Sequence, residues 1–587
     1  MPIRHGVRLA KNSATRVFEL PQKTVYKRIF SNQNGRNIKE RQMRMFALSV
    51  VALAAALPVI AVDTDATDKV LRQMLKKEGF TGKVEDSLEK RMGRKVDAAR
   101  ADLGRLIFFD KGLGLHKSNA CAGCHSPTHG WGDTQSIARG IQNNNIVGAA
   151  PPPLGRDGPR NQRRTPTIAN TAFYPVMMWN GRFSSESGNP FDNSKGYKFP
   201  PPEGDGLFLP KDPRFFHLLV AQAHIPFTEL PEMAGFTGIK EAGAYECSVL
   251  LPKNIPFRAN IKTQSSAQKS VLRMKLLDDT PVAKPDYCQF DDKQGTPLPL
   301  RFPDTDVMNA PIRLQVLNEI NRIEEYRSRF AALYPQVKGG NNIDFWMIGQ
   351  ALAEFQIQET YAKAPIDKYA AGETNALTPA AKRGAVAFFG KAQCVQCHST
   401  KGQSNEMFSD FKMHNAGVPQ IAPVFGKGTG NVAFRDMAGN ITLAGNLDLG
   451  LFEFLNNDEA NKFKFRTSPL RNVSLQPAFF HNGSFTRLED AVRFHVDAVR
   501  WAHSYDPAVA GVAPDLKKPA TATTDRVLST LDPKLAKTPA LSEAEIKDLV
   551  TFLSEGLLDA RARPDGLMAK IPTSLPSGAK LPTFVKP

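Results

Sequence analysis

The sequence predicts a mainly α-helical protein built from two similar halves that are joined by long loops. Two pentapeptides of the form C-x-x-C-H stand far apart in the chain, at residues 121–125 (CAGCH) and 394–398 (CVQCH). Each follows a segment in which a glycine precedes a pair of phenylalanines, at residues 104–109 (GRLIFF) and 384–389 (GAVAFF). The alternation of apolar and polar residues that is typical of strands is sparse. These observations indicate an internal duplication of a helical unit.

Helix start signals are clearest in the second half. Thr378 and Pro379 form a good N-cap and first-turn pair, because the proline lacks an N–H that would otherwise stay unsatisfied there. Small and apolar residues between positions 381 and 388 then share one helical face. Nearer the C-terminus, Ser542 and Glu545 have the spacing of a capping box. Apolar residues at helical spacing follow this box: Ile546, Leu549, Val550 and Leu553.

The composition is that of an ordinary globular chain. Of 587 residues, 41% are hydrophobic and 23% are charged. There is no glycine period, no sustained heptad and only one long apolar stretch, which excludes collagen, a coiled coil and a polytopic membrane protein. The 43 glycines and 43 prolines indicate long loops. We expect unstructured or inserted stretches near residues 138–162, 236–308 and 503–540 and in the Pro-rich tail after Pro564.

Residues 1–61 resemble a targeting segment, a basic extension followed by a signal peptide. The apolar run 45–61 (MFALSVVALAAALPVIA) follows two arginines and ends in small residues that suit cleavage after Ala61. The alternative is an uncleaved anchor, since a run of this length is near the lower limit for spanning a bilayer. Cleavage predicts export to the periplasm.

The net charge of +18 depends largely on that segment. Residues 1–61 carry eleven Lys and Arg but only two Glu, so the rest of the chain has 65 basic and 56 acidic residues, a net charge of +9. No basic cluster is interleaved with aromatic residues, so we expect no nucleic-acid partner. A positive surface can still attract an acidic protein donor over a distance.

The two pentapeptides predict covalently bound haem c at two places. The cysteines attach to the haem vinyl groups and the adjacent histidine ligates the iron. The residues are Cys121, Cys124 and His125 in the first motif and Cys394, Cys397 and His398 in the second. A zinc site would need four ligands gathered from distant motifs, and a thioredoxin-like pair needs a βαβ setting. We therefore expect two cytochrome c-type haem domains whose glycine-bearing helices approach the haems closely.

The two remaining cysteines, Cys247 and Cys288, lie in a Pro- and Lys-rich stretch. In an oxidising compartment we expect a disulfide that closes this loop, with free thiols as the alternative. Such a bond would staple an insertion and would take no part in the chemistry.

With these flanks, the sequence resembles the bacterial di-haem cytochrome c peroxidase family, which includes the MauG-like enzymes. The resemblance runs from about Leu103 to Leu558. Beside C-x-x-C-H, it rests on residues 103–110 (LGRLIFFD), 164–170 (RTPTIAN), 179–182 (WNGR), 465–472 (FRTSPLRN), 480–483 (FHNG) and 488–491 (LEDA). It implies an N-terminal peroxidatic domain over 62–345 with an insertion at about 236–308. A C-terminal electron-transfer domain over 346–562 and a Pro-rich tail over 563–587 complete the expected organisation.

The resemblance assigns roles to two residues outside the pentapeptides. Trp179 takes the position of a tryptophan that relays electrons between the haems, and a buried core tryptophan is the alternative. Glu232, followed by Met233, takes the position of a distal-pocket glutamate that moves a proton between the peroxide oxygens. The alternative for Glu232 is a solvated loop acid, as its neighbour Glu229 illustrates.

The sixth ligand of the second haem departs from the family pattern. The peroxidases have a methionine and MauG has a tyrosine where this chain has His495. The resemblance then implies an iron held by His398 and His495, with a low potential because imidazole favours ferric iron more than a thioether does. A surface histidine on an amphipathic helix is the alternative, and Met413 and His414 are rival ligands.

Two further departures concern the first haem and calcium. No histidine between His125 and Arg164 has the spacing of the removable distal ligand that many members carry, so we expect a first haem that is five-coordinate or water-bound at rest. His129 is interpreted as a surface or propionate-contacting residue. Arg164 stands where the family has an asparagine ligand of calcium, and arginine offers no oxygen. The sequence therefore does not decide whether calcium is bound. We expect Arg164 to contact a haem propionate or to replace the charge of the ion.

The resemblance implies a periplasmic enzyme that reduces hydrogen peroxide to water with electrons from a small cytochrome c or a cupredoxin. Whether it forms a homodimer stays open. One alternative is a MauG-like or rubber-oxygenase-like oxidase that acts on an organic or protein substrate. A di-haem electron carrier without substrate chemistry is the other.

Overall fold

The computed structural model divides the chain into residues 1–62 and residues 63–587. It describes residues 64–141, 145–148, 160–161, 163–199, 208–235, 237, 294–296, 309–421, 448–453, 458–516, 523–536 and 540–586. The predicted signal peptide, the predicted disulfide between Cys247 and Cys288 and most of the expected insertion 236–308 lie outside the described residues. The larger unit contains both pentapeptides.

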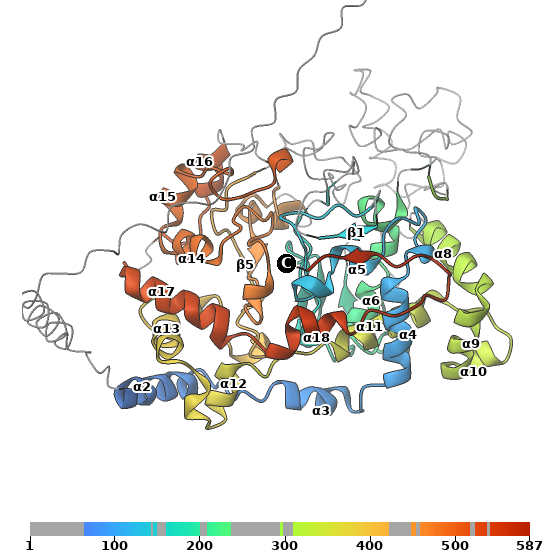
Figure 1. Ribbon diagram of the computed structural model, residues 1–587, viewed down its shortest axis with the longest axis horizontal. Helices are drawn as coiled ribbons and strands as arrows, with labels where there is room; N and C mark the ends of the chain where they lie inside the picture. Colours follow the sequence, from blue (N-terminus) through green and yellow to red (C-terminus); the bar gives the residue numbers. More distant parts are fainter. Residues whose placement is uncertain are drawn as a thin grey trace, which may run out of the picture. The chain divides into compact units, whose positions relative to one another are not determined.

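Helices make up most of the regular structure, as the sequence predicted (Figure 1). The longer ones are α2 (Thr64–Lys77), α4 (Ala98–Phe109), α8 (Ala310–Arg322), α9 (Glu324–Leu333), α11 (Phe345–Gln358), α13 (Pro379–Phe389), α14 (Leu488–Val496) and α17 (Glu543–Thr551). Shorter ones are α3 (Leu88–Met92), α5 (Cys121–Cys124), α6 (Leu218–Gln222), α10 (Pro335–Lys338), α12 (Pro365–Ala370), α15 (Ala498–His503), α16 (Thr524–Leu528) and α18 (Pro564–Met568). The expectation of a mainly α protein is confirmed.

The strands are short and form small pairings. They are β1 (Ile146–Val147), β2 (Val176–Met177), β3 (Phe183–Ser185), β4 (Tyr197–Lys198), β5 (Met413–His414), β6 (Phe465–Arg466) and β7 (Thr583–Phe584). Strands β2, β3 and β4 form an antiparallel sheet, β5 pairs with β6 in antiparallel fashion, and β1 pairs with β7 in parallel. In the β5–β6 pair, Met413 is opposite Arg466 and His414 is opposite Phe465.

The C-terminal tail, which the sequence suggested to be unstructured, packs along the first half of the unit (Figure 1). Strand β7 pairs with β1, in the register Ile146 opposite Thr583. Ser577 donates its hydroxyl to the buried Asp110, and the rings of Phe584 and Phe109 lie 5.8 Å apart. A Pro-rich composition therefore does not prevent this segment from being ordered, because its partners lie far away in the sequence.

Two helix pairs repeat the same packing in the two halves. Helix α4 packs against α11 and helix α13 packs against α17. A Cβ added to Gly104 would lie 1.9 Å from the Ala351 carbonyl oxygen, and one added to Gly384 would lie 1.9 Å from the Asp548 carbonyl oxygen. The prediction that these glycines admit a haem was wrong: they admit the backbone of the partner helix. The repeated contact supports the internal duplication.

The local helix signals are also confirmed. The Thr378 side chain accepts a hydrogen bond from the Ala381 N–H, and Pro379 occupies the first turn of α13. Ser542 and Glu545 form the capping box of α17, in which each side chain bonds the backbone N–H of the other. Each such cap stabilises a helix by about 1 kcal/mol.

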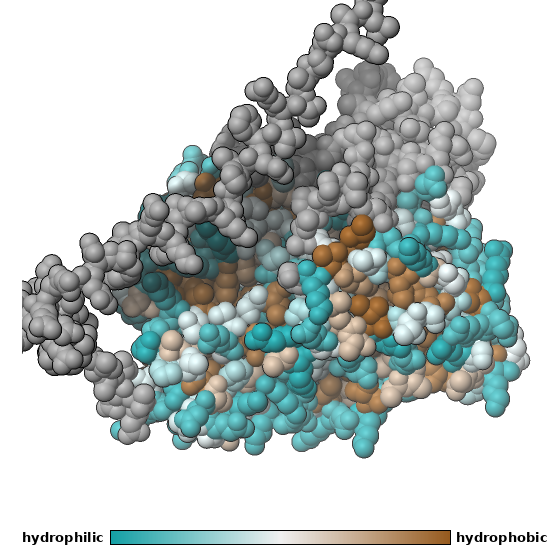
Figure 2. Space-filling model, in the orientation of Figure 1, coloured by the Kyte–Doolittle hydropathy of each residue, from teal (hydrophilic) through white to brown (hydrophobic). Residues whose placement is uncertain are grey.

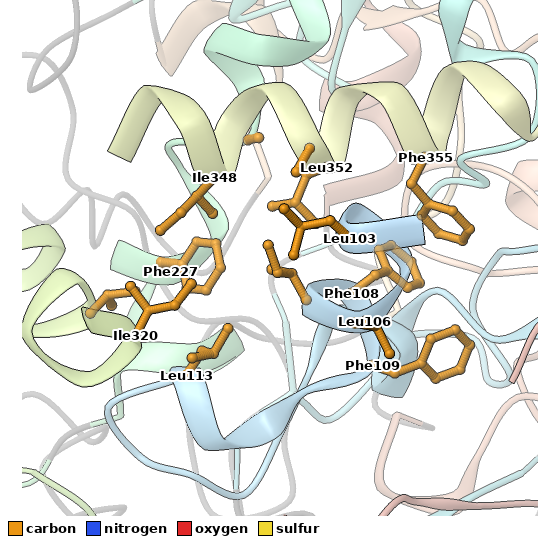
Figure 3. Close-up of a cluster of buried hydrophobic side chains, with 14 of the residues drawn as sticks. Leu103, Leu106, Phe108, Phe109, Leu113, Phe227, Ile320, Ile348, Leu352 and Phe355 are labelled. Atoms are coloured by element: carbon orange, nitrogen blue, oxygen red, sulfur yellow. The ribbon is translucent and has the colours of Figure 1, made fainter. Parts of the chain in front are cut away.

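The largest core cluster lies between α4 and α11 (Figure 3). The figure shows Leu103, Leu106, Phe108 and Phe109 from α4 together with Ile348, Leu352 and Phe355 from α11. Full burial of such a side chain contributes roughly 1.5–3 kcal/mol. A corresponding cluster surrounds α13 and α17 and includes Phe388, Phe408 and Phe552. The close helix pairs thus form the centres of both halves.

This packing bears on the expected domain division. Helix α11 begins at Phe345, so all but its first residue fall in the second domain expected from residue 346, yet it packs on α4 and α6 of the first half. The boundary stays a prediction, and the packing favours one that follows α11. Polar side chains cover much of the face seen in Figure 2, with hydrophobic side chains gathered near its middle. Within the described ranges, no helix combines the length and the apolar character needed to cross a bilayer.

Candidate functional site

Each C-x-x-C-H motif lies on the wall of a cavity. The first motif forms helix α5, and the second forms a 3₁₀ turn over Cys394–Gln396. In both motifs, the backbone N–H of the histidine donates to the backbone carbonyl of the first cysteine at 2.8 Å. A helical turn places positions i, i+3 and i+4 on one side, so both cysteines and the histidine face the same cavity. The second motif lines the larger cavity and the first motif the smaller one.

The larger cavity has two histidines facing each other. The ring centres of His398 and His495 lie 6.2 Å apart. His398 donates through Nδ1 to the Phe408 carbonyl at 3.0 Å, and His495 donates through Nδ1 to the Ala491 carbonyl at 2.8 Å. These bonds fix the tautomers in which Nε2 carries the lone pair, which is how a ligating histidine is usually held. Two imidazoles that share one metal atom through bonds of about 2 Å would have a similar separation.

Electrostatics favour the neutral form of both rings. Burial, together with the proximity of His495, lowers the pKa of His398 to about 4. Burial also lowers the pKa of His495. Because a metal binds the neutral imidazole, both histidines are in the ligating form at neutral pH.

The rival ligands are arranged differently. Asp532 lies 2.6 Å from His414 Nδ1 and Asp410 lies 3.0 Å from its Nε2. Asp410 above all raises the pKa of His414 to about 10, so this ring is an imidazolium with both nitrogens donating. Met413, which precedes it in β5, is not among the residues that line the larger cavity. Among the described residues, Cys397, Asp410 and His414 could meet at a metal ion, but thioether formation at Cys397 would remove its thiolate.

The smaller cavity combines one histidine with a carboxylic acid. Burial lowers the pKa of His125 to about 4, against the influence of the Trp131 and Pro166 carbonyls. Glu232 lines the same cavity, and burial, reinforced by Glu229, raises its pKa to about 8. Of the histidines in the described ranges, His125 is the one on this wall. The cavity therefore contains both a proton-carrying group and a potential iron ligand.

Glu232 and its neighbour Glu229 have different surroundings. Both belong to the turn around the π-helical segment Leu230–Ala234. Glu229 forms an ion pair with Arg182 at 3.3 Å, whereas Glu232 lines the cavity and its backbone carbonyl accepts from the Asn119 side chain at 2.9 Å. Of the two acids, the one on the cavity wall is the one that the resemblance selected.

His129 is buried and does not lie on the surface, which was one of the two positions predicted for it. Its Nδ1 lies 2.8 Å from the Thr128 hydroxyl. Its backbone carbonyl accepts from the Gln476 side chain at 3.0 Å. Burial above all, and then the charge of Arg164, lowers the pKa of His129 to about 4. The expectation of a surface histidine was wrong, because the turn over Pro127–His129 folds inward, and a contact with a propionate stays a prediction.

One wall separates the two cavities, and Trp179 belongs to it. Its indole N–H donates to the Arg164 carbonyl at 2.6 Å, and its own carbonyl accepts from the Arg466 N–H at 2.6 Å. The residues that line both cavities are Arg164, Pro166, Thr167, Tyr174, Trp179 and Arg466. Trp179 is thus fixed at the boundary between the two halves of the candidate site.

The same wall contains two buried arginines. Burial lowers the pKa of Arg164 and that of Arg466 to about 10 each. Arg164 donates to Gln476 at 2.8 Å, and its Nε has no hydrogen-bond partner among the described residues. Arg466 donates to the Met178 and Thr467 carbonyls. Buried charges are costly unless they are paired. The buried Asp133 compensates part of the charge of Arg164, and the remaining positive charge of this wall fits a ligand that carries carboxylates, as the propionates of haem do.

The donor set of both cavities therefore fits haem. Each cavity offers a cysteine pair, a buried neutral histidine and the shared cationic wall. The aromatic residues Phe108 and Phe388, from α4 and α13, line the smaller and the larger cavity respectively. This is the contact that the glycine-bearing helices make with the two cavities.

Comparison with known proteins agrees with this geometry. The family model described as "Di-haem cytochrome c peroxidase" matches residues 98–246 and 293–375. Over these segments the chain is similar to the di-haem cytochrome c peroxidase family. It is an oxidoreductase of the cytochrome-c peroxidase type, and the family implies haem c cofactors. The residues between the two matched segments, 247–292, fall within the expected insertion at 236–308.

The chain is similar both to proteins named cytochrome-c peroxidase and to proteins named MauG. Cytochrome-c peroxidase IdrP1 of Pseudomonas sp. (strain SCT) is 22% identical over 414 residues, which cover 68% of this chain and 72% of the relative. Methylamine utilization protein MauG of Methylophilus methylotrophus is 23% identical over 412 residues, which cover 70% and 76%. Among solved structures, the diheme peroxidase BthA from Burkholderia thailandensis E264 has a TM-score of 0.43 and 17% identity, with 83% of this chain and 91% of that chain covered.

Sequence reasoning missed part of the site. Arg466 and Tyr174 contribute to the wall between the cavities, and Arg182 pairs with Glu229 beside Glu232. Arg466 and Arg182 lie inside blocks that carried the family resemblance, so their positions were marked although their roles were not. Tyr174 had no such signal, because its place depends on the contact between the two halves.

Proposed function

We propose that this protein reduces hydrogen peroxide to water at the smaller cavity, with electrons that enter at the larger one. The observation that carries the proposal is the asymmetry of the two cavities. His398 and His495 face each other across the larger cavity, which suits electron transfer without substrate binding. The smaller cavity combines His125 with the acid Glu232, which suits a reaction that consumes protons.

Haem c at both places supplies the redox chemistry. Cys121 and Cys124 would attach the first haem, and His125 would hold its iron. Cys394 and Cys397 would attach the second, which has two facing histidines for its iron. Arg164 and Arg466 would neutralise propionates at the wall, where they are the buried cations.

Glu232 provides the proton transfer that peroxide reduction needs. Its carboxylate takes a proton from one peroxide oxygen and delivers it to the other, so that water is the leaving group. A pKa of about 8 makes both protonation forms accessible near neutral pH. The nearby pair of Glu229 and Arg182 tunes this acid through charge, since the former raises and the latter lowers its pKa.

Trp179 would relay electrons between the cavities. It lines both of them, and two backbone hydrogen bonds fix its ring and its chain position. A purely structural tryptophan would not need to be shared between the two walls. This placement supports the relay role in the proposal.

The partners follow from the same proposal. Hydrogen peroxide is the substrate, and a small cytochrome c or a cupredoxin is the electron donor, which a positive surface would attract. Export of the chain would place the reaction in the periplasm.

The test is peroxide-dependent oxidation of a reduced small cytochrome c by the mature holoprotein, compared between as-isolated and pre-reduced enzyme. Fast turnover of both forms is the expected result, since the smaller cavity needs no reductive release of a second histidine. No turnover, although peroxide alters the haem spectrum, would contradict the proposal and favour the second candidate. Spectral silence towards peroxide would leave an electron carrier.

The second candidate is a MauG-like or rubber-oxygenase-like oxidase of an organic or protein substrate. Two observations favour it: the similarity to MauG, and a histidine, His495, where the peroxidases have methionine. In this case the oxidising equivalents from peroxide would pass to the substrate. Consumption of peroxide without oxidation of the donor cytochrome would distinguish it.

A further inference from the structure

The buried carboxylate of Glu359, which lies outside both cavities, accepts hydrogen bonds from two oxidisable aromatic side chains. The indole N–H of Trp131 donates to Glu359 Oε2 at 2.8 Å, and the hydroxyl of Tyr361 donates to the same oxygen. Lys570 donates to the other oxygen, Oε1, at 3.2 Å. Trp131 and Glu359 are fully buried and Tyr361 is 6% exposed. The proposed peroxide chemistry uses none of these residues.

This cluster lies directly behind the histidine of the smaller cavity. The ring centres of His125 and Phe108 are 6.2 Å apart, and those of Phe108 and Trp131 are 5.8 Å apart. The backbone of Trp131 has a φ of 61°, a left-handed conformation that is strained for a bulky residue. Hydrogen bonds to Ser126 and Ile168 hold it there. The fold therefore maintains an indole at this place at an energetic cost.

We propose that Trp131, Glu359 and Tyr361 form a second oxidisable site for the first haem, which removes oxidising equivalents when donor electrons are lacking. The proposal rests on the proposed peroxide reaction, which supplies the oxidant. In the step, Tyr361 loses one electron, through Trp131, to the first haem site after this has reacted with peroxide. The phenolic proton moves to Glu359, which leaves a neutral tyrosyl radical and a protonated carboxyl group. One electron from a reductant, such as the donor protein or ascorbate, and return of that proton restore the resting state.

The carboxylate distinguishes this site from Trp179. Loss of an electron from tyrosine requires an acceptor for the proton within hydrogen-bond reach, and a carboxylate is such a base. Glu359 meets this requirement for Tyr361, whereas the indole of Trp179 donates to a backbone carbonyl, which is a poor base. Trp179 therefore suits rapid passage of electrons, and the cluster suits storage of a radical.

The test is freeze-quench electron paramagnetic resonance of the holoprotein, mixed with hydrogen peroxide in the absence of donor. An organic radical is expected that narrows when the protein contains ring-deuterated tyrosine. Tyr361→Phe should abolish the tyrosine-derived signal, and Glu359→Gln should diminish it, because glutamine cannot take the proton. Tyr334→Phe is the matched control and should keep the signal, since Tyr334 is buried but donates to the neutral amide of Gln350.

Peptide mass spectrometry gives a second readout. Oxygen addition at Trp131 and Tyr361 should grow with the number of peroxide equivalents, and ascorbate should suppress it. A tyrosine signal that persists in Tyr361→Phe, or no radical in a protein that consumes peroxide, would overturn this inference and leave the proposed function intact. A holoprotein whose haem spectrum does not respond to peroxide would overturn both.

Discussion

The two cavities are built from the same parts and differ in the residue that accompanies the motif histidine. In the larger one, His495 faces His398 at a ring separation of 6.2 Å. In the smaller one, the acid Glu232 shares the wall with His125. Both have a C-x-x-C-H turn, a glycine-bearing helix and the same cationic wall. A duplicated scaffold thus carries a facing histidine in one cavity and an acid in the other.

This difference between the cavities arises from the elements that carry His495 and Glu232. His495 comes from α14, in the chain segment that follows the second motif, and its ring is held by the Ala491 carbonyl within the same helix. Glu232 comes from a π-helical turn, whose irregular backbone lines the smaller cavity. A regular helix carries the histidine and an irregular turn carries the acid, so the elements that differ between the halves also separate their proposed roles.

Removal of the acid should have the largest effect. Glu232→Gln should lower kcat/KM for peroxide by about 10²–10⁴-fold, the usual contribution of a positioned acid or base. Because the carboxylate form must accept the first proton, kcat/KM of the unmodified enzyme should rise with pH through about 8, the raised pKa of Glu232. The variant should lack this rise. Steady-state kinetics between about pH 6 and about pH 9.5 measure both.

Glu229→Gln is the matched control for that prediction. It removes a like charge that raises the pKa of Glu232, so the pH profile should move to lower pH while the plateau rate stays close to that of the parent. A profile that is the same in all three proteins would mean that another group titrates. In that case Glu232 would not be the acid of the reaction.

A change of the facing histidine should alter the second haem and spare the first. His495→Met should raise the potential of one haem by roughly 0.1–0.3 V, within the range of about 0.8 V that axial ligands span. A thioether favours the ferrous state more than an imidazole does. Potentiometric titration followed by absorption spectroscopy measures this shift. His503→Gln serves as the control, because His503 lies on α15 with a half-exposed side chain and is not part of the lining of the larger cavity, so the potential should barely change.

The tryptophan on the shared wall should affect transfer between the cavities. Trp179→Phe should slow donor-driven turnover, while pre-reduced enzyme should react with its first equivalent of peroxide at the parental rate. It should also lower the free energy of unfolding by about 1–3 kcal/mol, since the buried Arg164 carbonyl loses its donor. Stopped-flow absorption and chemical denaturation test these effects. Trp346→Phe, on α11 and outside the lining of both cavities, should leave turnover unchanged.

Local features of the fold could be predicted from the sequence, and long-range ones could not. The caps at Thr378 and Ser542 depend on residues within one turn, and the structure confirms them. The partner of Gly384 is Asp548, 164 positions later, and the spacing of glycine and phenylalanine alone did not reveal it. For the same reason, the ordered C-terminal tail was missed, because its strand pairs with residues near 146.

In the candidate site, too, the residues marked by local spacing could be predicted and those placed by long-range contacts could not. The cysteines and histidines of the motifs were marked by spacing, and the roles given to His495, Trp179 and Glu232 came from the family resemblance and stay predictions. Arg466 was quoted as part of a block, yet its place on the shared wall depends on contact between the halves. Residues that act through tertiary neighbours leave no periodic signal in a single sequence.

The smallest expected effect concerns calcium at the wall that both cavities share. By the family resemblance, Arg164 takes the position of an asparagine that ligates calcium, and its buried guanidinium supplies a positive charge without an oxygen. A divalent cation beside it would be repelled, so prolonged dialysis against a calcium chelator should leave turnover and the free energy of unfolding unchanged. Inactivation that added calcium reverses would show that an ion occupies the wall. It would then link the two cavities more directly than the arginines do, and the charge at their boundary would have to be reassigned from Arg164 to the metal.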